Sequence, residues 1–342
     1  MMDIRNYALP GSLDTAVITF DTLEDGKRDR RPVRMKVHHP QGPGPYPCVI
    51  VSHGAGGDYN THFAHARHLA THGYIVVCVE HRGSNSDLLR KSFRKLRVLE
   101  DMTHDRREVF ARPEDVSFAL DEVARWNRNH PVLQRRFDLE KVGMLGHSFG
   151  AATTLMLCGA RVATTWLRPK VSSDGELGPS VREKRIRCGV ALSPQGPGEP
   201  FFSGTSYDSM QTPVLGISGT NDQVQNGLAP KSRLDAFSLW PKGEHQFVWL
   251  DNARHIDFTD ATGSGSQMLP SPTRAAVQPV LLAATLIFLN QHLRPSADNG
   301  DRLSVSSLRR YLTGEIDSVS VLSNPAPAKS KSLPTNRPSP LQ

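Results

Sequence analysis

Short apolar runs alternate along the chain with longer stretches in which apolar residues recur at helical spacing. The short runs are rich in β-branched residues and are bounded by turn-forming residues, a pattern typical of strands buried on both faces. We predict eight strands, at residues 16–20, 33–38, 49–53, 75–80, 142–146, 188–193, 214–218 and 246–250. The alternation predicts an α/β fold in which a mostly parallel eight-stranded sheet is flanked by helices.

Four helices are predicted between these strands, over residues 61–72, 113–129, 148–159 and 273–293. Gly73 marks the end of the first helix, because glycine readily adopts the positive φ that ends many helices. Pro113 predicts the start of the second helix, since proline is favoured in the first helical turn.

The predicted organisation is one catalytic domain over residues 1–294 and a tail over residues 295–342. Two polar segments interrupt the alternation: 84–112 follows the fourth predicted strand, and 161–184 follows the helix predicted at 148–159. In a sheet of this kind both would project from the carboxyl ends of the strands, where ligands bind. They are lid candidates, with plain surface insertions as the alternative. The tail gains Ser, Pro and Lys and loses apolar periodicity, so we expect it to be disordered, apart from a possible short helix at 302–312.

Charge and composition narrow the class of protein. The formal net charge is +7, but the basic residues are scattered, so no nucleic-acid partner is predicted. The longest late apolar run, Val280–Leu289, is shorter than the ~20 residues that span a bilayer, so no stable membrane insertion is expected. With no secretory pattern near Met1, we expect a cytoplasmic protein. The four cysteines lie in apolar runs without metal-ligand spacing and are predicted to be free thiols.

The stretch Gly146-His147-Ser148-Phe149-Gly150 fits the G-x-S-x-G nucleophile elbow. An apolar strand precedes it and a helix of small residues follows, which is the context that this motif requires. The turn would expose the Ser148 hydroxyl at the start of a helix, where the helix dipole favours developing negative charge. We therefore predict Ser148 as a nucleophile.

A serine nucleophile needs a base and an acid, which follow it in this fold in the order Asp or Glu, then His. Asp222 leaves the strand at 214–218, and His255 follows the strand at 246–250. His245 is the alternative base, but it lies at the opposite end of that strand. We predict Asp222 and His255 as the acid and the base.

Two backbone N–H groups are needed to stabilise a tetrahedral oxyanion. The elbow supplies that of Phe149, and the glycine-rich loop His53-Gly54-Ala55-Gly56-Gly57 supplies that of Ala55. Such a loop could also bind phosphate or close a hairpin, but it lacks the spacing of the phosphate-binding fingerprints. We predict Ala55 and Phe149 as the oxyanion hole.

With these features in order, the chain resembles the α/β-hydrolase family of bacterial predicted dienelactone hydrolases and platelet-activating-factor acetylhydrolase-like esterases, and more distantly cutinase-like polyester hydrolases. The stretches that carry this resemblance are Ser52–Gly57, His72–Val77, Arg112–Val116, Gly146–Gly150 and Ala253–Phe258. The resemblance implies hydrolysis of carboxylic esters without a metal or cofactor. Because dienelactone hydrolases use a cysteine nucleophile and this chain has Ser148, dienelactone activity is not implied.

The sequence therefore predicts a serine esterase that acts on a small-molecule ester through a Ser-Asp-His triad and an acyl-enzyme. An amidase or a peptidase could use the same triad. A ligand-binding protein without catalysis could also use the same fold. All triad positions are filled, which favours an enzyme.

Overall fold

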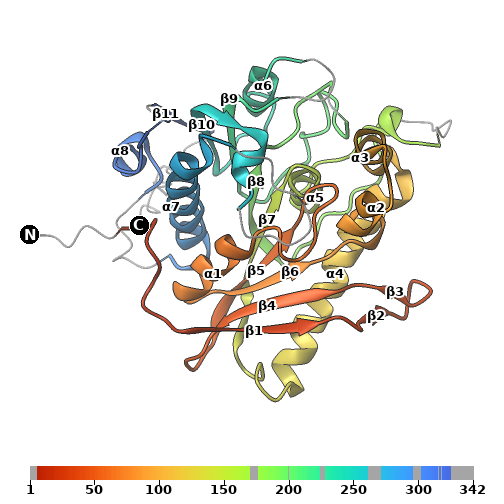
Figure 1. The fold of residues 1–342 in the computed structure, drawn as a ribbon, viewed down its shortest axis with the longest axis vertical. Helices are drawn as coiled ribbons and strands as arrows, with labels where there is room; N and C mark the ends of the chain where they lie inside the picture. The colour runs from red at the N-terminus through yellow and green to blue at the C-terminus, as the bar shows by residue number, and fades with distance from the viewer. Residues whose placement is uncertain are drawn as a thin grey trace, which may run out of the picture.

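A mixed β-sheet runs through the protein in the computed structural model (Figure 1). The structure describes residues 6–169, 176–198, 200–223, 228–260, 271–295, 302–314, 316 and 318–324. Nine strands of the described residues form the sheet, in the order β1-β4-β6-β5-β7-β8-β9-β10-β11. In chain order they are β1 Thr15–Phe20, β4 Met35–Pro40, β5 Tyr46–Ser52, β6 Ile75–Val79, β7 Phe137–His147, β8 Ile186–Leu192, β9 Val214–Asn221, β10 His245–Arg254 and β11 Val319–Asn324. Strands β2 Glu24–Asp25 and β3 Arg31–Pro32 pair separately.

The six central strands are parallel, and in sheet order they are β6, β5, β7, β8, β9 and β10. The outer strands pair antiparallel: β1 with β4, β4 with β6, and β11 with β10. The carboxyl ends of the parallel strands consequently meet at one edge of the sheet. All eight predicted strands are present, and the prediction of a mostly parallel sheet flanked by helices is confirmed.

The ninth strand corrects the prediction for the tail. Strand β11 pairs antiparallel with β10 in a register that runs from His245 opposite Asn324 to Leu250 opposite Val319. A short helix, α8 Val305–Arg309, precedes it, and its Leu308 is fully buried. This helix lies within the predicted short helix at 302–312, whereas the expectation of disorder is wrong for strand β11. Without β11, the backbone N–H and C=O groups along the outer edge of β10 would be unpaired. The tail fills this edge, although its weak apolar periodicity does not predict a strand.

Helices cover both faces of the sheet (Figure 1). Helices α4 Arg106–Asn129 and α5 Phe149–Leu157 pack against one face, and α1 Phe63–Thr71 and α7 Arg274–Leu293 pack against the other. Helix α7 is long and apolar enough to cross a membrane by length and composition, but two thirds of its most apolar window is buried in the protein, as expected for a core helix. The four cysteines are buried and free, as predicted.

Helix α4 begins seven residues before the predicted start at Pro113. Asp105 caps it by accepting a hydrogen bond from the N–H of Arg107 at 2.8 Å, so Pro113 lies inside the helix. A proline costs an interior helix one hydrogen bond, which the burial of this long helix can offset. Arg112, the last residue of the first lid candidate, therefore lies on a core helix.

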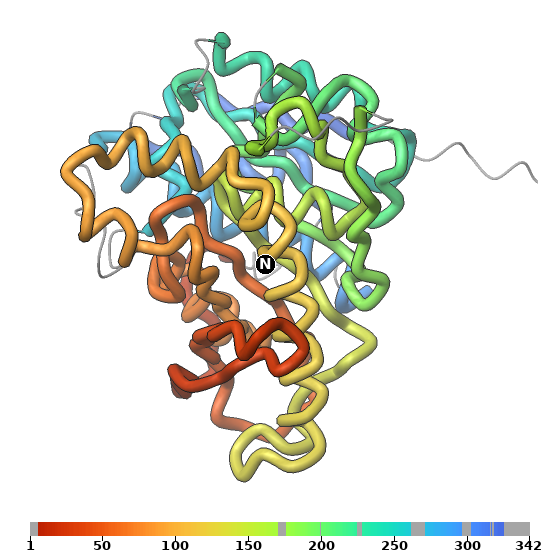
Figure 2. The backbone as a smooth tube through the Cα atoms, turned by 90° about the vertical axis from the view of Figure 1, so that its right-hand side faces the viewer, coloured from red at the N-terminus to blue at the C-terminus, as the bar shows by residue number. Residues whose placement is uncertain are grey.

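The segment 84–112 is largely helical. It contains the end of η1 Arg82–Ser84, helices α2 Ser86–Arg90 and α3 Lys95–His104, and the first turns of α4. Figure 2 shows the α2 and α3 region, in orange, projecting from the body of the protein before the chain enters α4. The second lid candidate, 161–184, contains η2 Thr164–Trp166 and lies partly outside the described residues. Helix α6 Lys231–Phe237 and the turn η3 His255–Phe258 complete the elements.

Candidate active site

Ser148 lies between the end of β7 and the start of α5, with φ 54° and ψ −116°. This positive φ is rare for a residue with a side chain and stores strain, as expected of a nucleophile elbow. Two glycines permit the turn, because a Cβ at Gly146 would overlap the Gly150 carbonyl and a Cβ at Gly150 would overlap the Ser52 carbonyl. The Ser148 N–H donates to Leu192 O of β8 at 2.9 Å, which ties the elbow to the neighbouring strand.

Asp222 and His255 lie at the ends of the next two strands, β9 and β10. His255 Nδ1 is 2.8 Å from Asp222 Oδ1. Asp222 is completely buried, whereas the His255 side chain is 33% exposed. Since an ionised carboxylate only accepts hydrogen bonds, Nδ1 carries the proton and Nε2 is left as an acceptor.

The residue before the serine joins the two parts of the site. His147 Nε2 lies 3.1 Å from the His255 carbonyl oxygen, and the two rings are 4.8 Å apart between centroids. The structure therefore brings Ser148, His255 and Asp222 to the same edge of the sheet. The alternative base, His245, lies at the other end of β10, where its Nδ1 accepts a hydrogen bond from Val214 N–H.

Three polar residues that the sequence did not indicate surround Asp222. Ser193 Oγ is 3.0 Å from Asp222 Oδ1 and 2.9 Å from His255 Nδ1. The Ser218 hydroxyl donates to Asp222 Oδ2 at 2.7 Å, and Arg233 Nε lies 3.5 Å from the same oxygen. Ser193 could have been found, because it is the last residue of the strand predicted at 188–193 and so lies at the same sheet edge. Arg233 gave no signal, since α6 was not predicted.

These neighbours hold the acid in its charged form. Burial by itself would raise the pKa of Asp222, but the charges of Arg233 and His255, with hydrogen bonds from His255 and Ser218, lower it below its ordinary value. Asp222 therefore remains a carboxylate at neutral pH and can orient the His255 ring.

The loop that follows β5 lies directly beside the elbow. A Cβ at Gly54 would be 3.4 Å from Ser148 Cβ and 3.3 Å from the His147 carbonyl oxygen. Among the described residues, the N–H groups of Ala55 and Phe149 have no hydrogen-bond partner. The two predicted oxyanion donors are therefore free, and both belong to segments that adjoin Ser148.

The first lid candidate packs on this loop. Gly56 N–H donates to Ser84 O at 2.8 Å, and Ser86 N–H donates to Gly57 O at 2.9 Å. A Cβ at Gly56 would overlap the side chain of Leu89 on α2.

The described residues contain no cluster of His, Cys, Asp or Glu side chains arranged to hold a metal ion.

Comparison with known proteins places the chain in a family. The family model described as "Platelet-activating factor acetylhydrolase, isoform II" matches residues 29–271, more than half of the chain. A platelet-activating factor acetylhydrolase from Cavia porcellus is 27% identical over 281 residues, which cover 72% of this chain and 58% of that protein. The protein of the same name from Bos taurus is 26% identical over 253 residues, covering 66% and 50%, and that from Canis lupus familiaris is 25% identical over 296 residues, covering 75% and 60%.

The matched regions thus span half to three fifths of the length of these relatives. The resemblance noted in the sequence is confirmed, and the mixed, mostly parallel sheet has the α/β-hydrolase fold. The chain belongs to the platelet-activating factor acetylhydrolase isoform II family.

Proposed function

We propose that the protein is a serine esterase that cleaves carboxylic esters, with Ser148 as nucleophile, His255 as base and Asp222 as the orienting acid. The observation that carries the proposal is the 2.8 Å contact between His255 Nδ1 and buried Asp222, beside a serine held in a strained turn. Membership of a family named for an acetylhydrolase supports the same reaction class.

The first half of the reaction forms an acyl-enzyme. Ser148 Oγ attacks the ester carbonyl carbon while its proton moves to His255 Nε2, and the Asp222 carboxylate stabilises the imidazolium. The N–H groups of Ala55 and Phe149 bind the oxyanion of the tetrahedral intermediate. When the intermediate collapses, the bond to the leaving alcohol breaks and the alcohol takes the proton from His255.

The second half releases the acid. A water molecule loses its proton to His255 Nε2 and attacks the acyl carbon, and the bond to Ser148 Oγ then breaks with return of the proton. Among the described residues, the Ser148 hydroxyl has no hydrogen-bond partner, so its proton can be transferred to a base without breaking another contact.

The substrate proposed is an ester with a short acyl group. The relatives are named platelet-activating factor acetylhydrolases, which favours acetyl over long acyl chains. The test is hydrolysis of p-nitrophenyl esters from C2 to C12, with an acetylated phospholipid, a polyester and a matched anilide alongside. We expect the rate to fall with acyl length and the anilide to be poor.

The control for this panel is Ser148→Ala. We expect it to lower the rate by about 10⁴-fold or more and to abolish labelling by a fluorophosphonate probe. Ester hydrolysis that survives this substitution unchanged would contradict the assignment. A folded wild-type protein that hydrolyses none of the esters would contradict the proposed function itself.

A further inference from the structure

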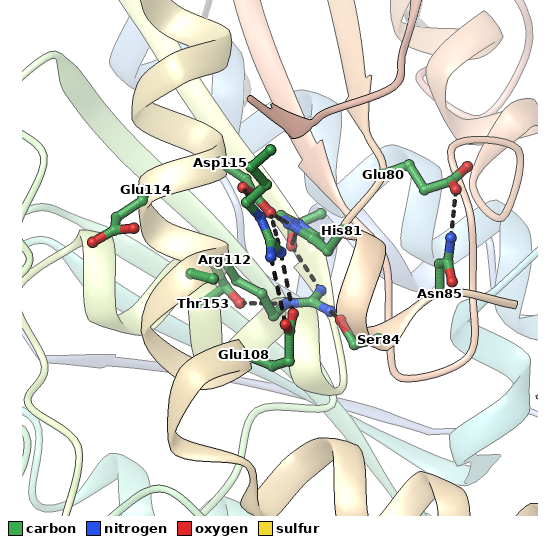
Figure 3. Close-up of polar contacts among 12 residues, drawn as sticks. Glu80, His81, Ser84, Asn85, Glu108, Arg112, Glu114, Asp115 and Thr153 are labelled. Carbon is green, nitrogen blue, oxygen red and sulfur yellow. Dashed lines mark hydrogen bonds and ion pairs between the residues drawn. The ribbon is translucent and has the colours of Figure 1, made fainter. Parts of the chain in front are cut away.

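A second set of serine, histidine and aspartate side chains lies in the interior, behind the loop that follows β5. Ser52 Oγ is 2.9 Å from His81 Nε2, and His81 Nδ1 is 3.0 Å from Asp115 Oδ2. All three residues are fully buried. Figure 3 shows His81 reaching Asp115 on α4, next to the guanidinium of Arg112.

This second set cannot supply a nucleophile to a substrate, because Ser52, His81 and Asp115 are all fully buried. Asp115 accepts the Nδ1 proton of His81, so His81 Nε2 accepts the Ser52 hydroxyl proton. The oxygen of Ser52 in turn accepts a hydrogen bond from Arg112 Nη2 at 3.1 Å. The set is therefore a hydrogen-bonded chain that ends on Arg112.

Arg112 is a fully buried cation whose hydrogen-bond partners are neutral. Its Nε donates to Thr153 Oγ1 at 3.1 Å, and its Nη1 donates to Ser84 Oγ at 2.7 Å. Figure 3 shows the guanidinium between Thr153 and Ser84. Burial lowers the pKa of Arg112 to about 9, with Asp115 and Glu108 opposing the shift, so the group stays charged at neutral pH.

The remaining contacts of Arg112 reach both segments that supply the oxyanion donors. Its Nη2 donates to the His53 carbonyl oxygen, and its guanidinium lies 4.2 Å from the ring centroid of Phe149. In a trans peptide the N–H points away from the C=O. A carbonyl of His53 held by Arg112 therefore turns the N–H of Gly54 away from the buried network.

The next peptide is held in the same way. His53 Nδ1 donates to the Gly54 carbonyl oxygen at 2.6 Å, and His53 Nε2 accepts from His81 N–H at 3.0 Å. The N–H that points away from this second carbonyl is that of Ala55, the predicted oxyanion donor. The His53–Gly54 peptide is thus oriented by Arg112, and the Gly54–Ala55 peptide by the His53 side chain.

The far end of the network is fixed by ion pairs. Asp115 Oδ1 lies 2.8 Å from Arg31 Nε and 2.8 Å from Arg28 Nη1, and Arg31 also pairs with Glu108. Burial, followed by the charges of Arg112, Arg31 and Arg28, holds the pKa of His81 well below its ordinary value. His81 is therefore neutral and has a single tautomer, which keeps the direction of each hydrogen bond fixed.

We propose that Arg112 is a positioning residue for the oxyanion hole, held in place by Ser52, His81 and Asp115. The proposal rests on the proposed esterase function. Arg112 does not contact the reacting atoms. It orients the Ala55 segment and packs against Phe149, so that both donors are in place before substrate binds.

The test compares Arg112→Met with wild type on p-nitrophenyl acetate and on the matched thionoester. Sulfur accepts hydrogen bonds weakly, so a working oxyanion hole accelerates the oxygen ester selectively. One lost donor costs about 10²- to 10³-fold, and a displaced donor costs less, so we expect kcat on the oxygen ester to fall about 30-fold with KM changed by less than about twofold. On the thionoester we expect a loss of less than about threefold.

Two controls separate positioning from general loss of structure. Val123→Ala removes buried packing on the same helix and is expected to lower stability while leaving kcat unchanged. Arg112→Lys keeps the charge and one donor and is expected to recover part of kcat. If Arg112→Met does not fold, Ser52→Ala, which removes only one hydroxyl, carries the test with an expected loss of about fivefold on the oxygen ester.

An unchanged kcat in Arg112→Met would overturn the proposal, and so would an equal loss on both esters. If Ser52→Ala carries the test, an unchanged kcat in that variant overturns it as well. Failure of the proposed function gives a different result, since wild type itself would then fail to hydrolyse p-nitrophenyl acetate.

Discussion

Two arrangements of serine, histidine and aspartate occur in this protein, and they differ in the exposure of the histidine and in the hydrogen bonding of the serine. In one, His255 Nδ1 is 2.8 Å from Asp222 at the carboxyl edge of the sheet. In the other, His81 Nδ1 is 3.0 Å from Asp115 under the first loop of that edge. The His255 side chain is one third exposed, whereas His81 is inaccessible.

Under the proposed function, access to the histidine and the state of the serine distinguish the catalytic set from the buried one. Ser148 is placed by a strained turn at the start of a helix, and its hydroxyl has no partner among the described residues. Ser52 belongs to a regular strand, and its hydroxyl both donates and accepts. Under the proposed function, the same residue types support chemistry in one place and rigidity in the other.

The largest expected effect comes from replacing the two aspartates. Asp222→Asn should lower kcat by about 10⁴-fold, because the amide favours the wrong tautomer of His255. Asp115→Asn should lower kcat by less than about tenfold, because the His81 chain only positions. The measurement is steady-state hydrolysis of p-nitrophenyl acetate by both variants.

Stability supplies the control for this pair. Each substitution removes a buried carboxylate from arginines that it pairs with, Arg233 for Asp222 and Arg28 with Arg31 for Asp115. Both variants should therefore lose about 3 kcal/mol of unfolding free energy in urea titrations. Equal losses of kcat in the two variants would show that the two arrangements do not differ in role.

A second comparison concerns the glycine that joins the two arrangements. Gly150 lies two residues after Ser148, and a Cβ there would overlap the carbonyl of Ser52. Gly150→Ala should therefore lower the unfolding free energy by about 3 kcal/mol and reduce kcat, since either the elbow or β5 must move. Gly26→Ala is the matched control, because a Cβ at Gly26 meets nothing within 4 Å. Equal stability in the two alanine variants would contradict the close approach.

The exposed arrangement could be anticipated from the sequence, because its residues follow strands. The ends of β7, β9 and β10 are legible as apolar runs, and the topology of parallel strands brings the residues after them to one edge. The structure places Ser148, Asp222 and His255 at that edge. Ala55 and Phe149 adjoin Ser148, but their part in binding an oxyanion stays a prediction.

The buried arrangement could not be anticipated, because its members come from contacts between distant elements. Arg112 and Asp115 belong to a helix whose start the sequence placed at Pro113, whereas Asp105 caps it. A charged residue beside a proline at the end of a polar segment resembles a surface residue. Only the packing of α4 against β5 and α5 reveals it as a buried cation. Strand β11 was missed for a similar reason, because it forms by pairing with the edge of β10 and not from an apolar pattern of its own.

A smaller effect should appear in the response of stability to acid. The pKa of His81 lies well below its ordinary value in the folded protein, so just below pH 6.5 the unfolded chain binds a proton that the folded chain does not. This histidine therefore makes stability fall as pH falls, by about 1.4 kcal/mol per pH unit. In His81→Gln the slope between pH 6 and pH 5 should be flatter by about that amount, measured by urea unfolding at each pH. Parallel slopes in the two proteins would contradict a neutral, buried His81.

The smallest expected effect tests the Ser193 hydroxyl, which contacts both Asp222 and His255. Ser193 Oγ lies 3.0 Å from Asp222 Oδ1 and 2.9 Å from His255 Nδ1, so it braces the pair without touching the reacting atoms. Ser193→Ala should raise the barrier by about 1 kcal/mol and lower kcat about fivefold, because Asp222 keeps Ser218 and Arg233. Pre-steady-state acylation by p-nitrophenyl acetate measures this change directly. A loss as large as that of Asp222→Asn would mean that Ser193, and not Asp222 alone, fixes the tautomer of His255.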